Sequence, residues 1–401
     1  MSRTTSSRPS RLTRDAQRLV TLSQSLALSG SRLEDAYWEN LLGAQLLKLL
    51  QGKKNRTVES ALDHLVPEHI NAYEILIEHA ETCSESAALT HLDQEYDVLL
   101  FSAPIVAWTR YQLGHDYSLG KSQPVLLELL KEHIGAENTR IAILSELVSF
   151  DQMPHSFQET LEWTRRLGRM ALTGKEDSPT IKPVAHPEGM LADARFIVGA
   201  IVTPKHQPVF RWQTAADQSP TRADALAHWS GAASEHLAPL FAGCTVEYLQ
   251  PDAFYTNSRE ADHRIRPLAL KAAVTWLQTA AGMAGGNLRA TIVGCGESLI
   301  EEYRIGFSTR QSPDVIYGCI WPILSKEEAI ADAMENDEVD TPEEIAALLN
   351  ELSITDVRRL PGLYATDFCD DCGAPYFPNP MGEMQHPELP EEIDINPLNF
   401  H

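Results

Sequence analysis

The residues with the clearest chemistry lie near the end of the chain, in the stretch FCDDCGAPYFPNPMGEMQH. Cys369 and Cys372 are separated by two residues, and Gly373 follows immediately. A tight turn of this kind lets two thiolates point at one metal ion while backbone N–H groups support the sulfurs. His386, with 13 residues between it and Cys372, is predicted to supply a third ligand to a zinc ion.

Several interpretations of the cysteine pair stay open. As a zinc knuckle, the turn with Cys369 and Cys372 would supply half of a zinc site. The fourth ligand could come from His401, Asp370, another histidine or a second chain. A thioredoxin-like redox pair is disfavoured, because the pair does not open a helix after a strand, where a thiolate would be stabilised. The remaining alternative is a turn that binds no ligand.

A second group of charged residues lies in the stretch SREADHRIRP, which contains Arg259, His263, Arg264 and Arg266. A helix that starts just before this stretch would bring Arg259, His263 and Arg266 onto one face, close to free backbone N–H groups. Such an arrangement is typical of a pocket for a phosphorylated or carboxylate small molecule. His263 is the only candidate for a general acid or base in this group.

The competing interpretation of the arginine stretch is a network of ion pairs that compensate one another. Glu260 and Asp262 lie among the arginines, and salt-bridged helix faces are common, so the sequence favours this alternative. An anion pocket would need at least one arginine whose charge no nearby acid cancels. Asn257 or Ser258 is the predicted cap of the helix.

Other residues offer weaker signals. Cys244, Cys295 and Cys319 lie in apolar stretches and are predicted to be small buried hydrophobic residues, because no base adjoins them in sequence. The stretch EEYRIGF, residues 301–307, alternates charges with aromatic residues and is predicted to be a strand. Its polar face could line a site, but the sequence favours a face in solvent. No nucleotide-binding, hydrolase or DNA-binding signature occurs in the chain.

Composition excludes several classes of protein. The 401 residues are 43% hydrophobic and 22% charged, which is typical of soluble globular proteins. A net charge of −23 argues against a protein covered by a phosphate-binding surface, because nucleic-acid-binding domains are normally basic. No apolar run is long enough to cross a membrane, and the first 18 residues lack the apolar stretch of a signal peptide, so we expect neither feature. We therefore expect a cytoplasmic protein without membrane or nucleic-acid partners.

The charge is unevenly distributed. Residues 3–18 contain five arginines and one acid, Asp15, and are predicted to start with a flexible arm. This arm could be a solvated tail, contact an acidic partner or nucleic acid, or belong to a transit peptide. Residues 326–401 contain 19 acids and three basic residues, which fits an interaction tail or a solubilising surface equally well.

The elements that must position these residues follow from hydrophobic periodicity. Apolar residues at helical spacing predict helices over the first quarter, with Ser31 and Glu34 forming a capping box. YDVLLFSAPIVAW is a continuous apolar run that predicts a buried strand, and ARFIVGAIVTP repeats it after a linker. Because helices and a further strand follow each run, we predict a duplicated strand–helix unit, with VFRW as a short extra strand.

The last third is predicted to begin with three strands, RATIVGCG, SLIEEYRIGF and PDVIYGCIWPIL, in an antiparallel meander that completes a mixed sheet. Two acidic helices follow, the second capped by Thr341. The predicted fold class is α/β. Its regions are a flexible basic arm (1–14), a helical region (15–92), a first α/β unit (93–173), a linker (174–190), a second α/β unit with the meander (191–325) and an acidic C-terminal region with the knuckle (326–401).

Several stretches together resemble an uncharacterised betaproteobacterial family, domain of unknown function two-eight-six-three. They are SGSRLED, APIVAWTRY, VFRWQ, PDAFY with READHRIRP, EYRIGF and CDDCGAPYFPNP. The resemblance spans the chain from about residue 8 to its tail. It implies a bacterial cytoplasmic protein and assigns no activity, cofactor or catalytic residue.

The sequence as a whole favours a non-enzymatic binding or regulatory protein with a structural zinc knuckle formed by Cys369, Cys372 and His386. In that role the knuckle would be a staple or a docking element for a protein partner. The alternative is an enzyme or sensor that binds a small anion at Arg259, His263, Arg264 and Arg266. The sequence leaves the partner, the ligand and the oligomeric state open.

Overall fold

The structure is a computed structural model that describes residues 12–66, 69–109, 113, 117–183, 191–213, 220–323, 328–329 and 340–390. Four parts of the sequence predictions lie mainly or wholly outside these ranges: the basic arm, residues 184–190 of the linker, the first acidic helix and His401. None of the described helices is long and apolar enough to cross a membrane.

Four helices open the chain, as the periodicity predicts: α1 (Arg14–Ala27), α2 (Arg32–Gln51), α3 (Asn55–Leu65) and α4 (Ile70–Glu85). The Ser31 hydroxyl accepts a hydrogen bond of 3.3 Å from the Glu34 N–H, which caps α2. The Glu34 carboxylate in turn accepts from the Gly30 N–H at 3.4 Å. The four helices bury a shared leucine-rich core that also reaches Leu161 of a later helix.

The central sheet contains six strands: β1 (Ser86–His91), β2 (Gln94–Trp108), β3 (Arg140–Ile143), β4 (Ala192–Pro204), β5 (Thr245–Tyr248) and β6 (Asp252–Ala253). The two predicted buried strands, β2 and β4, lie antiparallel at its centre. Two details differ from the predictions. β1 lies at the end of the predicted helical region, and VFRW forms a single bridge from Phe210 to Gly135 before a 3-10 helix.

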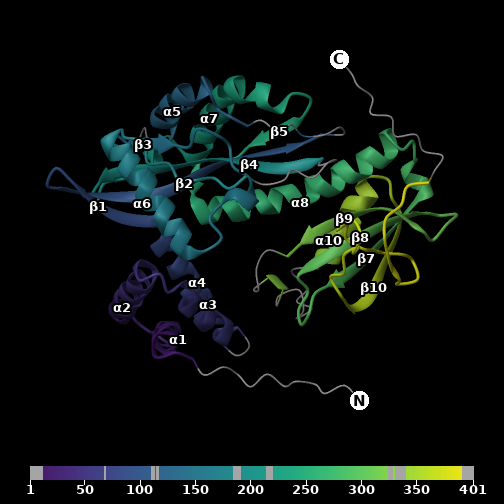
Figure 1. Ribbon diagram of the computed structural model, residues 1–401, viewed down its shortest axis with the longest axis horizontal. Coiled ribbons are helices and arrows are strands. Elements are labelled where there is room, and N and C mark those ends of the chain that lie inside the picture. The colour runs from purple at the N-terminus through teal and green to yellow at the C-terminus, as the bar shows by residue number, and fades with distance from the viewer. Residues whose placement is uncertain are drawn as a thin grey trace.

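The two strand–helix units exchange their outer strands. β3 follows β2 in sequence but pairs with β4, whereas β5 follows β4 but pairs with β2. α5 (Ser122–His133) and α7 (Arg222–Leu237) pack together on one face of the sheet. α6 (Phe157–Thr173) and the start of α8 (Phe254–Thr279) cover the other face (Figure 1). Both units thus contribute corresponding elements to each layer.

A second sheet holds the predicted meander, β7 (Leu288–Cys295), β8 (Glu302–Thr309) and β9 (Val315–Pro322). The meander lies outside the central sheet. β10 (Asp356–Tyr364) pairs with β7 in parallel and, with the meander, makes a separate mixed sheet in the order β10-β7-β8-β9, so the predicted mixed sheet is present. The sequence does not predict β10, because it is polar and contains Pro361, which an edge strand tolerates.

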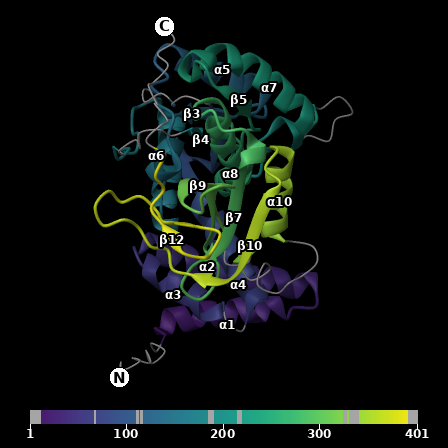
Figure 2. The ribbon, with the colours of Figure 1, turned by 90° about the vertical axis from the view of Figure 1, so that its right-hand side faces the viewer.

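The second sheet has a different cover on each face. The C-terminal half of α8 and α10 (Thr341–Glu351) pack on one face, with α10 capped by Asp340, one residue before the predicted cap. The C-terminal segment packs on the other face and contains the hairpin of β11 (Phe377–Pro378) and β12 (Met384–Gln385). Figure 2 shows this segment and α10 on opposite sides of β7 and β10.

Candidate metal centre

Cys369 and Cys372 lie on a tight turn closed by backbone hydrogen bonds. The Cys369 N–H donates to the Ala374 carbonyl at 2.8 Å, and the Gly373 N–H donates to the Cys369 carbonyl at 2.9 Å. Gly373 has a φ of 72°, a left-handed conformation that glycine adopts without steric cost. The residue types of the sequence motif therefore match the local geometry of a knuckle.

His386 is positioned by the hairpin that follows the knuckle. Asn379, which is fully buried, makes the loop of this hairpin: its side-chain oxygen accepts from the N–H groups of Met381 and Glu383 at 2.9 and 3.0 Å. Its backbone N–H donates to the Glu383 carbonyl at 2.9 Å. β12 therefore runs back along β11 and brings His386 to the cysteines.

The structure brings the three predicted metal ligands together. The ligand atoms of Cys369, Cys372 and His386 all lie within 4.8 Å of one another, and the Cys372 Sγ is 3.1 Å from the His386 Nε2. These distances are compatible with one bound metal ion. The other ring nitrogen of His386 lies 3.8 Å from a carboxylate oxygen of Glu388, which is beyond hydrogen-bond distance.

The electrostatics of the turn favour a thiolate. Backbone N–H groups of Cys372 and Asp371 donate to Cys369 and lower the pKa of its thiol below the ordinary value. Metal ions bind the deprotonated form of cysteine. Asp370 is not part of the cluster. Within the described ranges, no histidine, cysteine or carboxylate joins the three residues as a fourth ligand.

Arg304 of β8 fastens the knuckle to the second sheet. Its side chain is fully buried, and its Nη1 donates to the carbonyls of Asp367 and Tyr376, one on each side of the knuckle, at 2.6 and 2.8 Å. Its Nε donates to Glu302 at 2.6 Å, and the guanidinium lies 5.0 Å from the ring centre of Phe368. The prediction that one face of this strand lies in solvent is therefore wrong, because the C-terminal segment covers that face.

Two glycines make room for the hairpin on the same face. Gly306 of β8 and Gly318 of β9 lie directly opposite each other in the sheet. A Cβ atom at Gly306 would lie 2.1 Å from the carbonyl oxygen of Pro378, and one at Gly318 would lie 2.2 Å from the Phe377 ring. The sequence shows no signal for this contact, since it depends on a segment about 60 to 70 residues away in the chain.

The arginine stretch on α8 is arranged differently from an anion pocket. The helix begins at Phe254, so Asn257 and Ser258 lie inside it and do not cap it. Asn257 is buried and donates to the carbonyls of Ser102 and Gln250. The prediction that Asn257 or Ser258 caps the helix is therefore wrong. The free N–H groups at the helix start lie a full turn or more away from the arginines.

Each arginine of this stretch is neutralised by an acid. The Nη1 of Arg259 donates to both carboxylate oxygens of Glu81 at 2.7 and 2.8 Å. Arg264 pairs with Glu260 at 3.0 Å and lies 3.7 Å from Glu247. These contacts match the network of ion pairs that the sequence favours.

Arg266 is paired in the interior of the protein. It is buried and donates to both carboxylate oxygens of Glu328 at 2.6 and 3.1 Å. Burial raises the pKa of the neighbouring Asp262 to about 6, although the charge of Arg266 opposes that shift. His263 is exposed. The four predicted ligand-binding residues therefore lie along one helix, and the three arginines among them are ion-paired.

The comparisons with known proteins identify one family. A family model described as a protein of unknown function (DUF2863) matches residues 4–400, which is nearly the whole chain. The chain belongs to this family, as its resemblance in the sequence implies. No curated protein and no solved structure matches the chain.

Proposed function

We propose that this member of the family is a non-enzymatic binding protein whose Cys369, Cys372 and His386 hold a structural zinc ion. The convergence of two sulfurs and one imidazole nitrogen within 4.8 Å carries the proposal. Two thiolates and an imidazole form a donor set that suits zinc and that hard cations such as Mg²⁺ disfavour. A fourth ligand would come from water, from His401 or from a partner.

The other four cysteines show no sign of activation for thiol chemistry. Burial raises the pKa of Cys295 to about 11 and that of Cys319 to about 12, which leaves little thiolate at neutral pH. Burial also raises the pKa of Cys83 and of Cys244. These four cysteines are therefore poor nucleophiles.

The zinc ion would order a surface for a protein partner. Phe368 and Met381 are 52% and 66% exposed, and they lie in the knuckle and in the hairpin loop that the ion would join. Leu363, at the end of β10, is 43% exposed. Exposed apolar side chains that lie close together on a surface are typical of sites that bind another protein. By fixing the knuckle and hairpin, the metal would hold these side chains in one arrangement.

The zinc proposal is tested by metal content and protease resistance. We expect purified wild-type protein to carry close to one equivalent of zinc, and Cys372→Ser to lose it. The variant should also be cut after Tyr364, because the ligands order a segment that has little core of its own. Cys244→Ser is the control. Cys244 lies outside the cluster, so this variant should retain the metal.

Metal-free wild-type protein with an equally resistant C-terminal segment would refute the zinc staple. The binding role is tested separately, by capture of partners from native cells with wild-type protein and with Cys372→Ser. We expect a partner that the wild type retains and the variant loses. Identical sets of captured proteins would contradict a docking role for the knuckle.

A further inference from the structure

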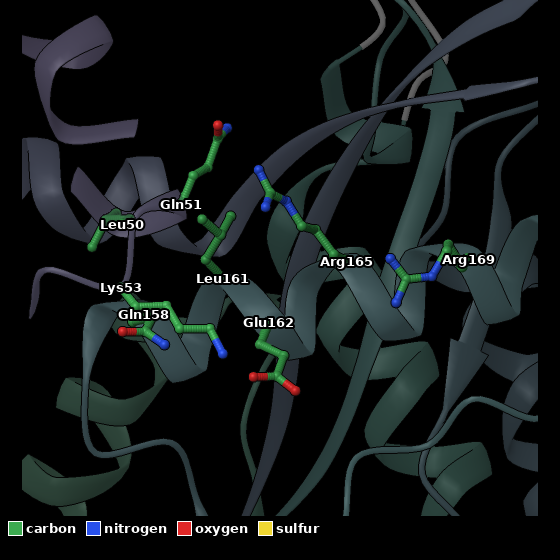
Figure 3. Close-up of a pocket in the computed structure, with 8 residues that line it drawn as sticks. All are labelled: Leu50, Gln51, Lys53, Gln158, Leu161, Glu162, Arg165 and Arg169. Atoms are coloured by element: carbon green, nitrogen blue, oxygen red, sulfur yellow. The ribbon is translucent and has the colours of Figure 1, made fainter. Parts of the chain in front are cut away.

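A cavity of about 270 Å³ lies where the end of α2 meets α6 (Figure 3). It is far from the knuckle in sequence and is built by other elements. The α2 end contributes Leu50, Gln51 and, in the following turn, Lys53. The remaining lining residues are side chains of α6: Gln158, Leu161, Glu162, Arg165 and Arg169.

The cavity is basic in a strongly acidic protein. Three cations and one acid line it, whereas the whole chain carries a net charge of −23. Arg169 is held by Asp177 through its Nη2 and Nε at 3.0 and 3.2 Å. The one acid, Glu162, lies 3.9 Å from Arg166, which is outside the lining.

Two of the lining cations differ from every arginine of the α8 stretch. Within the described part of the chain, neither Lys53 nor Arg165 has an acidic group within 4 Å. Arg165 is half-buried, and Figure 3 shows its side chain extended toward the end of α2. The requirement that an anion pocket hold an uncancelled arginine, which the α8 stretch does not meet, is met here.

The backbone of Lys53 adds a second observation. Lys53 has a φ of 56°, in the left-handed region, and its N–H donates to the Leu50 carbonyl at 3.2 Å as α2 ends. Glycine is the usual residue at such a helix end, because it has no Cβ. A lysine at this position keeps a cation at the rim of the cavity at a conformational cost.

The rest of the lining limits the kind of ligand. Leu50 and Leu161 are 1% and 3% exposed and give the cavity an apolar floor. Gln51 and Gln158 add amide groups that can donate hydrogen bonds. The volume is of the size that a small organic molecule occupies. We propose that this cavity binds a small organic dianion, a phosphate monoester or a dicarboxylate, through Lys53, Arg165 and Arg169.

The proposal is tested by thermal shift with two probes, glycerol 3-phosphate and succinate. Either probe should raise the melting temperature of the wild type, by about 3 °C at a hundred times its dissociation constant. Arg165→Gln should abolish the rise. Lys53→Gly should abolish or strongly weaken it while folding at least as well as the wild type, because glycine relieves the left-handed backbone.

Arg264→Gln is the matched control, because Arg264 is a paired arginine on another helix, and it should respond like the wild type. A rise with glycerol 3-phosphate alone would identify the phosphate class, and a rise with succinate alone the dicarboxylate class. No rise with either probe would overturn the proposal. A rise of the same size in Arg165→Gln and Lys53→Gly would also overturn it, since the anion would then bind elsewhere.

Discussion

Glu85, the last residue of α4, links the helical region to α8. It is 7% exposed, and its carboxylate accepts a hydrogen bond of 2.9 Å from the Tyr255 N–H in the first turn of α8. The residue that precedes α8, Ala253, has no side-chain acceptor, so Glu85 provides this cap from another helix. Burial raises the pKa of Glu85 to about 7, although the Tyr255 N–H and the charge of Arg259 oppose the shift.

The raised pKa makes the stability of the protein depend on pH. The pKa in the folded protein lies above the ordinary value of 4.5, so the folded state holds a proton that the unfolded chain releases between these values. The resulting stabilisation is complete below pH 4.5 and is lost as the pH rises through 7. Ionised Glu85 therefore costs stability at neutral and alkaline pH.

We expect Glu85→Gln to remove this contribution, because glutamine retains the acceptor oxygen and has no charge to bury. The free energy of unfolding of the wild type should fall by up to about 3 kcal/mol more than that of the variant between about pH 5 and about pH 8. Urea unfolding at both pH values measures the difference. Equal falls in both proteins would show that Glu85 does not titrate in this range.

Two half-buried acids do not confound that comparison. Burial raises the pKa of Asp193 and that of Asp262 to about 6, and both residues are present in the wild type and in Glu85→Gln. Their contributions have the same sign and cancel when the two proteins are compared. The overall fall in stability toward alkaline pH should therefore persist, in reduced form, in the variant.

At the scale of elements, the second sheet is shaped to receive the C-terminal hairpin. The facing glycines of β8 and β9 leave a depression that Phe377 and Pro378 of β11 fill. Phe377 is 4% exposed as a result. Close approach of two backbones is a recognised reason for glycine inside a strand, where it otherwise weakens the sheet.

Gly318→Ala should therefore destabilise the protein by about 1–3 kcal/mol, because its Cβ would overlap the Phe377 ring. Gly231→Ala is the control: Gly231 lies in α7 with no atom within 4 Å of an added Cβ, so alanine should stabilise by up to about 1 kcal/mol. Chemical unfolding measures both changes. Equal effects of the two substitutions would mean that the hairpin does not pack on β9 as described.

At the scale of the whole molecule, α8 belongs to two hydrophobic cores. Its first half, including Phe254 and Ala261, packs on the central sheet, and its second half, including Leu270 and Leu277, packs on the second sheet. Pro267 lies inside the helix near the change from one core to the other. Figure 1 shows the helix running from beneath the central sheet to the second sheet. The two sheets are thus joined by a continuous element.

We expect this shared helix to couple the unfolding of the two sheets. Leu277→Ala should cost about 2–5 kcal/mol, since Leu277 is fully buried in the second core. Hydrogen exchange should then accelerate in β2 of the central sheet as well as in β7 and β8. Faster exchange confined to the second sheet would show that the two cores unfold independently.

The sequence by itself determined the features that depend on neighbouring residues. The apolar runs predict β2 and β4, Ser31 and Glu34 predict the start of α2, and the spacing of Cys369 and Cys372 with Gly373 predicts the knuckle turn. In each case the interactions that decide the structure act within one element or one turn. A short stretch of sequence therefore contains the residue types needed to predict it. The family resemblance, spread over the whole chain, is likewise confirmed.

Only the tertiary structure decided how distant segments meet. It pairs β10 with β7, buries Arg304 beneath the knuckle, and gives the arginines of α8 their acidic partners Glu81 and Glu328. Among the residues that the structure describes, it leaves Arg165 without such a partner at the cavity beside α2. The identity of a charged residue or a glycine does not indicate which distant residue will contact it, because the packing of whole elements determines that contact. The local pattern therefore predicted the elements and the knuckle, and the packing decided which charged residues remain free to bind.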